Sequence, residues 1–384
     1  MDFDLTSEQS LLKDTAIRWA ADTYGSLDAV QAARAEPLGF SEATWAELAG
    51  LGLAGLPFSE GDGGFGGGPL ETQLVMEALG RALAPEPYLA SVVLGGGALR
   101  LAANDAQRVE LLPAIIDGSL RLAFAHAEEQ ARYDLHDVAT TARATGDGYV
   151  LDGRKSVVLN ADAAGLLVVS ARTSGARRDA DGITLFLVPA DKPGVEIVAY
   201  PTHDGGRAGD VLLSAVPVPE TAVLGRVGEA LAVIEQVQEG AIAAIAAEAV
   251  GLMEALHGLT LDYLKTRRQF GVPIGNFQVL QHKAVDMLVA LEQARSMALY
   301  AAMMVDAADT EERRAALSAV KVQINRSARF VGQTAVQLHG GIGMTMEYLG
   351  AHHFRRLAAI ELMFGDTPFH LRRVTAAGGL VSSQ

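Results

Sequence analysis

Hydrophobic residues recur at helical spacing through the first third of the chain. Leu12, Ala16 and Trp19 share one face of the first run, and Thr6 stands where a helix start is expected. Further runs of the same kind continue as far as about residue 121. Residues 1–121 are therefore predicted to form an N-terminal all-α domain.

The pattern changes to alternation between residues 122 and 226. Short β-branched runs are separated by Asp-Gly pairs, as expected for strands joined by tight turns. The runs lie at 120–129, 149–153, 155–160, 166–172, 183–189 and 211–216. Short strands at this spacing predict an antiparallel β-barrel or sandwich, so residues 122–226 are expected to form a middle β domain.

Helical spacing returns from about residue 228, in longer runs with few helix breakers. Ile234, Ile245 and Leu252 keep a period near 3.6 in the first of them. Long helices of this kind predict a C-terminal four-helix bundle over residues 227–384. The predicted fold class is therefore α+β, with a β domain between two helical domains.

The composition narrows the class of protein. The 384 residues are 49% hydrophobic, contain no Cys and carry a formal net charge of −15. The absence of Cys excludes disulfides, Cys-ligated zinc and thiolate catalysis, and it fits a reducing cytosol. The negative charge argues against a nucleic-acid partner, because phosphate binding needs a basic face.

No segment has the pattern of a signal peptide or of a membrane span. The first residues lack a basic region followed by an apolar run. The most apolar window, 240–256, contains Glu248 and Glu254 and is too short to cross a bilayer. We therefore expect a cytoplasmic protein with no membrane partner.

A glycine-dense loop at 60–69 precedes one of the N-terminal helices. A phosphate-binding loop would follow a strand and would continue into Lys-Ser or Lys-Thr, and neither feature is present. A turn between helices is the simpler interpretation of this loop.

The segment 263–282 carries candidate binding chemistry. Arg267 and Phe270 are three residues apart on a predicted helix, so they are expected on one helix face. A guanidinium suits a pyrophosphate, because its fork matches two oxygens and its charge does not titrate. Phe277 and Gln278 follow, with an aromatic face and an amide group available to a cofactor. Taken by itself, however, this segment also fits a solvated helix end beside ordinary core residues.

A second segment, 337–348, decides between these interpretations. The order and spacing of the two segments, within long helices, resemble the acyl-CoA dehydrogenase family over essentially the whole chain. The sequence looks closest to the small subunits of pimeloyl-CoA-type dehydrogenases. The resemblance implies that Gln337, Gly340 and Gly341 approach an FAD bound by a neighbouring subunit, where paired glycines let backbone come close. His339 is expected to be a packed histidine.

In this family, FAD lies between the β domain and the C-terminal bundle, and a carboxylate removes the α-proton of an acyl-CoA. The resemblance places Thr367 near the flavin. The two usual positions of the base fall on Gly365 and on Ala241, and the family's nearby Arg falls on Ile242. Neither glycine nor alanine can accept a proton, so the usual catalytic base is absent.

The β domain departs from the family at the same site. The Thr that bonds the flavin aligns with Ala127, and the Ser that meets the CoA moiety aligns with Tyr133. The Trp-x-Thr that covers the flavin ring aligns with 157–159, which reads Val-Val-Leu. Each buried polar atom of a ring left without a partner costs roughly 1–3 kcal/mol. The residues that hold a ring are thus replaced, whereas those lent to a neighbour are kept.

We interpret this asymmetry as a division of labour within a heteromeric acyl-CoA dehydrogenase. A paralogous subunit would supply the base and the ring pocket, while this chain completes that subunit's FAD site. A heterotetramer is expected, with a homotetramer as the alternative. Acyl-CoA is the expected substrate and an electron-transfer flavoprotein the expected electron acceptor. Dicarboxylyl, steroid and fatty acyl groups all fit the sequence.

Two other interpretations stay open at this point. An active homomer could use Asp366, Glu239 or Glu361 as a displaced base, because each lies near a usual base position. The fold could also serve as a scaffold or binding module without flavin. No metal site is expected.

Overall fold

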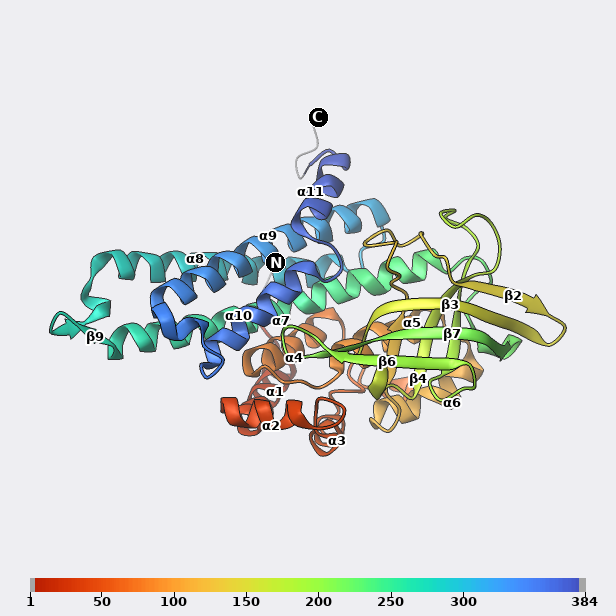
Figure 1. Cartoon of the computed structure of the whole chain (residues 1–384), viewed down its shortest axis with the longest axis horizontal. Helices are drawn as coiled ribbons and strands as arrows, with labels where there is room; N and C mark the ends of the chain where they lie inside the picture. Colours follow the sequence, from red (N-terminus) through yellow and green to blue (C-terminus); the bar gives the residue numbers. More distant parts are fainter. Residues whose placement is uncertain (1–3, 380–384) are drawn as a thin grey trace.

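The computed structural model describes residues 4–379 and has three parts, with the β domain at one end of the long axis and the N-terminal helices below the C-terminal bundle (Figure 1). The N-terminal part is helical. It consists of α1 (Ser7–Tyr24), α2 (Leu27–Ala35), α3 (Glu42–Gly50), α4 (Pro69–Ala82), a π-helix η2 (Leu89–Gly95), α5 (Gly96–Ala102) and α6 (Asp105–Ile116). Thr6 and Gln9 form a reciprocal capping box at the start of α1. The glycine-dense loop packs against the backbone of the preceding segment. A β-carbon on Gly64 would lie 2.7 Å from the carbonyl oxygen of Gly55, so this position has no room for a side chain.

The middle part is a mixed eight-stranded sheet. Its strands are β1 (Leu122–Ala125), β2 (Thr141–Thr145), β3 (Gly148–Leu159), β4 (Leu166–Arg172), β5 (Ile183–Pro189), β6 (Val195–Pro201), β7 (Arg207–Pro219) and β8 (Val223–Leu224). The order is β6-β7-β3-β2-β4-β5-β8, and β1 pairs with β4. The sheet is mostly antiparallel, but β1 and β2 each run parallel to β4.

Three strands of the sheet were not predicted, and two predicted runs are one strand. β2 buries only Ala142, β6 has no fully buried side chain and β8 has two residues, so each of them gives only a weak apolar signal. Residues 149–153 and 155–160 were expected as separate strands, but β3 continues from Gly148 to Leu159 with two register shifts against β7. The shifts bend the strand without ending it.

The C-terminal part is a bundle of long helices (Figure 1). Its helices are α7 (Leu231–Thr266), α8 (Gln278–Met304), α9 (Thr310–His339), α10 (Leu349–Leu362) and α11 (Thr367–Ala376). A two-stranded hairpin, β9 (Arg268–Gln269) and β10 (Val272–Pro273), joins α7 to α8. The expected fold class, helical domains on either side of a β domain, is confirmed.

Helix α7 forms the core of the molecule. It crosses α4 so closely that a β-carbon on Gly80 or on Gly251 would lie closer than 3.0 Å to backbone oxygen of the other helix. Among residues 4–379, α7 is the one helix long and apolar enough to cross a membrane, and 78% of its most apolar window is buried inside the protein. Its apolar character therefore has a packing role. Glu248 within it is paired with Arg356 of α10, Nε to Oε1 at 2.5 Å.

Candidate functional site

A cavity lies where the β sheet, the π-helix η2 and α7 meet, and it contains the positions expected to hold a flavin ring. Most of its lining is apolar. It is lined by Leu94, Phe124, His126, Ala127, Ala131, Arg132, Asp134, Leu135, Val157, Leu159, Ile234, Gln238 and Phe364. We call it the ring cavity. Ala127, Val157 and Leu159, which replace the polar and aromatic ring contacts of the family, therefore do face the expected site.

The polar residues around the ring cavity are engaged with one another. Lys155 is fully buried and its Nζ donates to Oε1 of Glu128 at 2.6 Å and to Oγ of Ser170 at 2.9 Å. Burial alone would raise the pKa of Glu128, but the charge and hydrogen bonds of Lys155 lower it to about 2. Burial also lowers the pKa of His126 to about 3, so this imidazole is neutral and its Nδ1 pairs with Ser170 at 2.9 Å. This network braces the wall of the cavity.

The turn that carries the family's base presents a different side chain from the one expected. The missing carboxylate was expected at Gly365, but the side chain that lines the ring cavity at this turn is Phe364. Gly365 has a positive φ of 118°, and a β-carbon there would lie 2.7 Å from Cδ1 of Phe369 and closer than 3.0 Å to Nε2 of His370. The position that aligns with the base, Gly365, therefore has no room for a larger side chain. Neither this glycine nor the phenyl ring of the preceding residue can accept a proton.

The other base position and the displaced carboxylates also do not line the ring cavity. Ala241 is fully buried within α7. Glu239 is buried as well, and its Oε2 accepts from Nε of Arg313 at 2.6 Å. Burial raises the pKa of Glu239 despite this ion pair. Ala241 and Glu239 therefore both pack inside the helical bundle.

The two remaining carboxylates at the turn have structural partners. Asp366 is the N-cap of α11, and its Oδ1 accepts from the backbone N–H of Phe369 at 2.8 Å. Glu361 pairs with Arg329 of α9, Oε2 to Nε at 3.2 Å. A carboxylate already holding a cap or an ion pair is poorly placed to take a proton from a substrate in the cavity.

Asp134 is the carboxylate that sequence reasoning missed. Among residues 4–379, it is the acidic side chain that lines the ring cavity. Its Oδ1 lies 3.0 Å from Nδ1 of His136, and its Oδ2 lies 3.5 Å from Arg178. The sequence gives no sign that Asp134 faces this cavity, because its orientation depends on how the loop after β1 folds.

Tyr133, the position expected to meet the CoA moiety, does not line the ring cavity. Its ring packs on Phe369 of α11, with centroids 5.3 Å apart, and burial raises the pKa of its hydroxyl. Thr367 does not line the cavity, and its Oγ1 accepts from Nδ2 of Asn325 at 3.3 Å. Asn325 in turn accepts from the buried Nζ of Lys321 at 2.7 Å. The Thr expected beside a flavin is thus part of a polar cluster under α11.

The segment around Arg267 is not the helix that the spacing predicts. Helix α7 ends at Thr266, and Arg267 already has an extended conformation with ψ of 127°. Phe270 and Gly271 form the two-residue turn of the β9–β10 hairpin, with φ of 52° and 82°. Arg267 and Phe270 therefore do not share a helix face. Phe277 caps α8 and meets Phe270 edge-on, with ring centroids 6.0 Å apart, and Gln278 begins α8.

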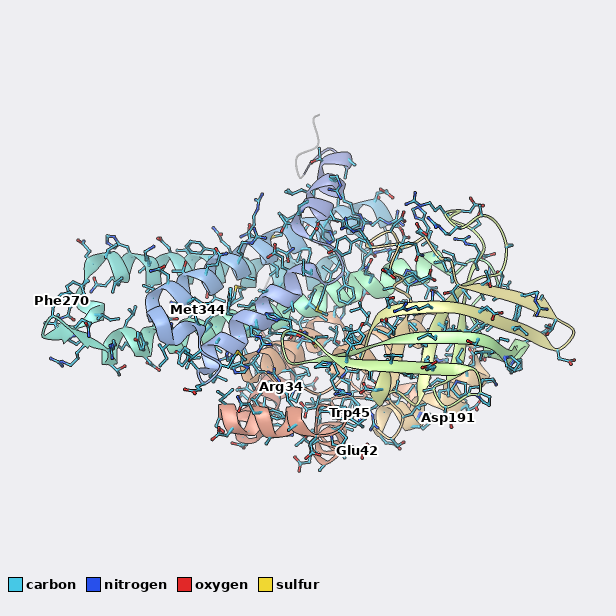
Figure 2. The ribbon with its side chains drawn as sticks, viewed as in Figure 1. Arg34, Glu42, Trp45, Asp191, Phe270 and Met344 are labelled. Carbon is cyan, nitrogen blue, oxygen red and sulfur yellow. The ribbon has the colours of Figure 1, made fainter. Side chains whose placement is uncertain are left out.

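The hairpin is exposed at the end of the bundle away from the β domain (Figures 1 and 2). Phe270 at its tip is 92% exposed. A left-handed backbone in a residue other than glycine costs roughly 1–2 kcal/mol. Apart from its edge contact with Phe277, this strained aromatic ring is exposed, so it points to contact with another molecule.

The second segment lies at the same end of the bundle as the hairpin. Gln337 is in the last turn of α9, and the exposed Gly340 and Gly341 follow it. The ring of His339 packs against Tyr263 of α7, with centroids 4.6 Å apart. Nε2 of His339 also lies 2.6 Å from the hydroxyl of Tyr348, so this histidine is packed and hydrogen-bonded. The contact between Tyr263 and His339 brings the segments 263–282 and 337–348 together.

The two halves of the site differ in how well they fit FAD. In the ring cavity, Ala127 and Leu159 offer no side-chain hydrogen bond to a flavin edge, and Gly365 leaves the turn beside Phe364 without a carboxylate, so these positions fit the ring poorly. The polar side chains in the lining are His126, Arg132, Asp134 and Gln238. At the hairpin, Arg267 and the two exposed glycines match a diphosphate, because they offer a fixed charge and close backbone approach. No group of three or more His, Asp or Glu suited to a metal occurs within residues 4–379.

Family models match all three parts of the chain. The acyl-CoA dehydrogenase N-terminal domain matches residues 6–119, the middle domain residues 123–214 and the C-terminal domain residues 232–379. The class is thus a three-domain flavoprotein dehydrogenase fold. The chain belongs to the acyl-CoA dehydrogenase family, whose members are FAD-dependent oxidoreductases that dehydrogenate CH–CH bonds.

Relatives of known sequence and structure agree with this family. The probable acyl-CoA dehydrogenase YngJ of Bacillus subtilis (strain 168) is 31% identical, over 99% of this chain and 100% of that protein. A point variant of the Tcur3481-Tcur3483 steroid ACAD is 30% identical, with a TM-score of 0.86 over 96% of this chain and 97% of that one. The FAD complex of PigA is 26% identical, with a TM-score of 0.89 over 98% and 99%.

Proposed function

We propose that this chain is the partner subunit of a heteromeric acyl-CoA dehydrogenase, and that it completes the FAD site of a paralogous subunit instead of holding a catalytic flavin of its own. The observation that carries the proposal is the turn at Phe364 and Gly365. There a phenyl ring faces the ring cavity and packing leaves no room for a side chain at Gly365. The resemblance to small subunits of pimeloyl-CoA-type dehydrogenases belongs to the same proposal.

The reaction of the assembled enzyme is α,β-dehydrogenation of an acyl-CoA thioester, for which bound FAD supplies the redox chemistry. This chain contributes binding and orientation. The guanidinium of Arg267 pairs with the FAD pyrophosphate of the paralogous subunit, and Phe270 packs against its nucleotide. Gln337 offers its amide, and Gly340 and Gly341 allow backbone to approach. Phe277 and Gln278 hold the base of the hairpin.

The exposure of these groups supports this role. Arg267 forms no side-chain hydrogen bond or ion pair within residues 4–379, and both glycines have open space where a side chain would be. A fixed cation, a strained aromatic ring and two exposed glycines at one end of the bundle form a surface that is complete only against another molecule. The steroid relative, whose name joins two components, provides a precedent of the same fold for a two-chain enzyme.

The displaced-base alternative has less support. Asp366, Glu239 and Glu361 each have a structural partner and none lines the ring cavity. We further propose an electron-transfer flavoprotein as electron acceptor and a cytoplasmic location, since a chain without Cys suits a reducing compartment. Pocket geometry does not rank dicarboxylyl, steroid and fatty acyl groups.

The test is co-expression with a candidate paralogous acyl-CoA dehydrogenase chain, purification through a tag on this chain, and flavin counting by absorbance. The expected result is one FAD per heterodimer with acyl-CoA oxidation, and neither flavin nor activity for this chain alone. A homomer that binds one FAD per chain and oxidises an acyl-CoA contradicts the proposal. A stable heteromer without flavin contradicts it in favour of the scaffold.

A further inference from the structure

A second cavity lies on the opposite face of α7 from the ring cavity. Its walls come from the π-helix η2, α5, α7 and the loop before α4. The cavity itself has a volume of about 90 Å³, and its mouth is open to solvent. The two cavities share no lining residue, although η2 and α7 contribute to both.

Two glycines that line this second cavity have no packing explanation. A β-carbon on Gly240 of α7 would have no atom within 4 Å, and one on Gly97 of α5 would meet only Cγ2 of Val237, at 4.0 Å. Both have ordinary helical backbone, where glycine costs roughly 0.5–1 kcal/mol relative to alanine. At Gly80 and Gly251 this cost is explained by the close crossing of α4 and α7. At Gly97 and Gly240 no such contact explains the glycine. Alanine would fit at either position and would increase the stability of the helix.

The buried side chains around these glycines are mostly apolar. Phe58, Val92 and Val237 are buried side chains of this lining, which also includes Thr72, Gln73 and Gln236. The apolar part of the lining offers dispersion contacts to an alkyl chain.

The rim of the cavity carries one cation and one anion. Arg100 and Asp306 are both exposed there, and neither forms a side-chain hydrogen bond or an ion pair within residues 4–379. One charge of each sign leaves the mouth with no net formal charge. A charged head would meet one attractive and one repulsive group, so the rim would not offset the cost of removing that charge from water, and an uncharged head is favoured.

We propose that this cavity is a binding site for a small uncharged aliphatic molecule, whose alkyl chain occupies the space beside Gly97 and Gly240. The site is separate from the ring cavity and from the hairpin. The proposal therefore does not rest on the proposed function, and the two can fail independently.

The experiment is calorimetric titration of the full-length chain with 1-hexanol, hexanoate and hexylammonium. We expect 1-hexanol to bind at least fivefold more tightly than either charged analogue. The variant Gly240→Leu, which places a side chain in the cavity, should weaken 1-hexanol binding at least tenfold. The absence of 1-hexanol binding, equal binding to Gly240→Leu, or tighter binding of a charged analogue would each overturn the proposal.

A second readout tests the glycine argument without any ligand. Gly240→Ala should raise the midpoint of thermal unfolding by about 2 °C, because it removes a helix-interior glycine without a clash. The matched control is Gly258→Ala, at an exposed position of α7 where a β-carbon also meets nothing within 4 Å. The control should raise the midpoint similarly and leave the 1-hexanol affinity within twofold. A lower midpoint for Gly240→Ala would mean that the chain's own packing requires this glycine, and would overturn the proposal.

Discussion

Nε2 of His370 lies closer than 3.0 Å to the position that a β-carbon on Gly365 would take. His370 is fully buried, and the same nitrogen lies 3.0 Å from the carbonyl oxygen of Phe364. Burial lowers the pKa of this imidazole to about 3, so it is neutral. The turn that would carry a catalytic carboxylate is therefore held by a packed histidine, and a single substitution cannot restore the base there.

Gly365→Ala should lower the free energy of unfolding by about 2 kcal/mol, because it combines backbone strain at positive φ with contact against His370 and Phe369. Gly341→Ala is the control, since a β-carbon there meets nothing within 4 Å, and its effect should stay within about 0.5 kcal/mol. Denaturant unfolding measures both. If the steric account is right, His370→Ala reduces the cost of Gly365→Ala in a double-mutant cycle. Additive effects would show that the two residues do not interact.

Substitutions of Asp366 distinguish its role as a helix cap from a role as a displaced catalytic base. Asp366→Asn should leave both stability and heteromer activity nearly unchanged, because asparagine is an equally good N-cap. Asp366→Ala should cost about 1 kcal/mol of stability through loss of the bond to the N–H of Phe369. Chemical denaturation and steady-state oxidation of acyl-CoA measure the two effects. Loss of activity in a stable Asp366→Asn protein would identify Asp366 as the base.

Substitution of Arg267 should weaken the binding of FAD to the paralogous subunit. In the purified heteromer, Arg267→Gln should weaken FAD binding by one to two orders of magnitude, because a charged hydrogen bond to pyrophosphate contributes about 1.5–3 kcal/mol. Arg143→Gln is the matched control, since Arg143 is exposed on β2 of the middle part. Fluorescence titration of the apo-heteromer with FAD gives both affinities. Equal affinity in the two variants would remove Arg267 from the cofactor site.

The Lys155–Glu128 pair predicts a loss of stability in acid. Glu128 has a pKa of about 2 in the folded protein and about 4.5 when unfolded, so between these values the unfolded chain binds the extra proton. Glu128 therefore contributes on the order of 3 kcal/mol to the free energy of unfolding. This contribution is fully present above about pH 4.5 and is lost as the pH falls toward 2. Glu128→Gln should be less stable at neutral pH, because Lys155 stays buried without its partner.

The measurement for this pair is unfolding free energy against pH for both proteins. The difference between wild type and Glu128→Gln should shrink between pH 4.5 and 2, since other carboxylates contribute equally to each. A difference that stays constant over this range would mean that Glu128 is not the titrating group.

The sequence identified those features that depend on local pattern. Helical and alternating periods separate the three parts of the fold, because a 3.6-residue and a 2-residue repeat cannot be confused over long runs. The same patterns missed β2, β6 and β8, which bury few side chains or are very short. They also assigned Arg267 and Phe270 to a helix, because the turn residues of the hairpin, Phe270 and Gly271, lack the usual Asn-Gly signal.

The sequence alone, through the family resemblance, predicted that the usual bases are missing and that candidate nucleotide-binding residues are kept, since these predictions concern residue types at aligned positions. Only the tertiary structure decided which side chain faces the ring cavity at that turn. The direction of Phe364, the contact of His370 with Gly365 and the meeting of Tyr263 with His339 depend on how α7, α9 and α11 pack. Residue type follows from the chain itself, whereas direction and proximity arise only when distant segments are brought into contact.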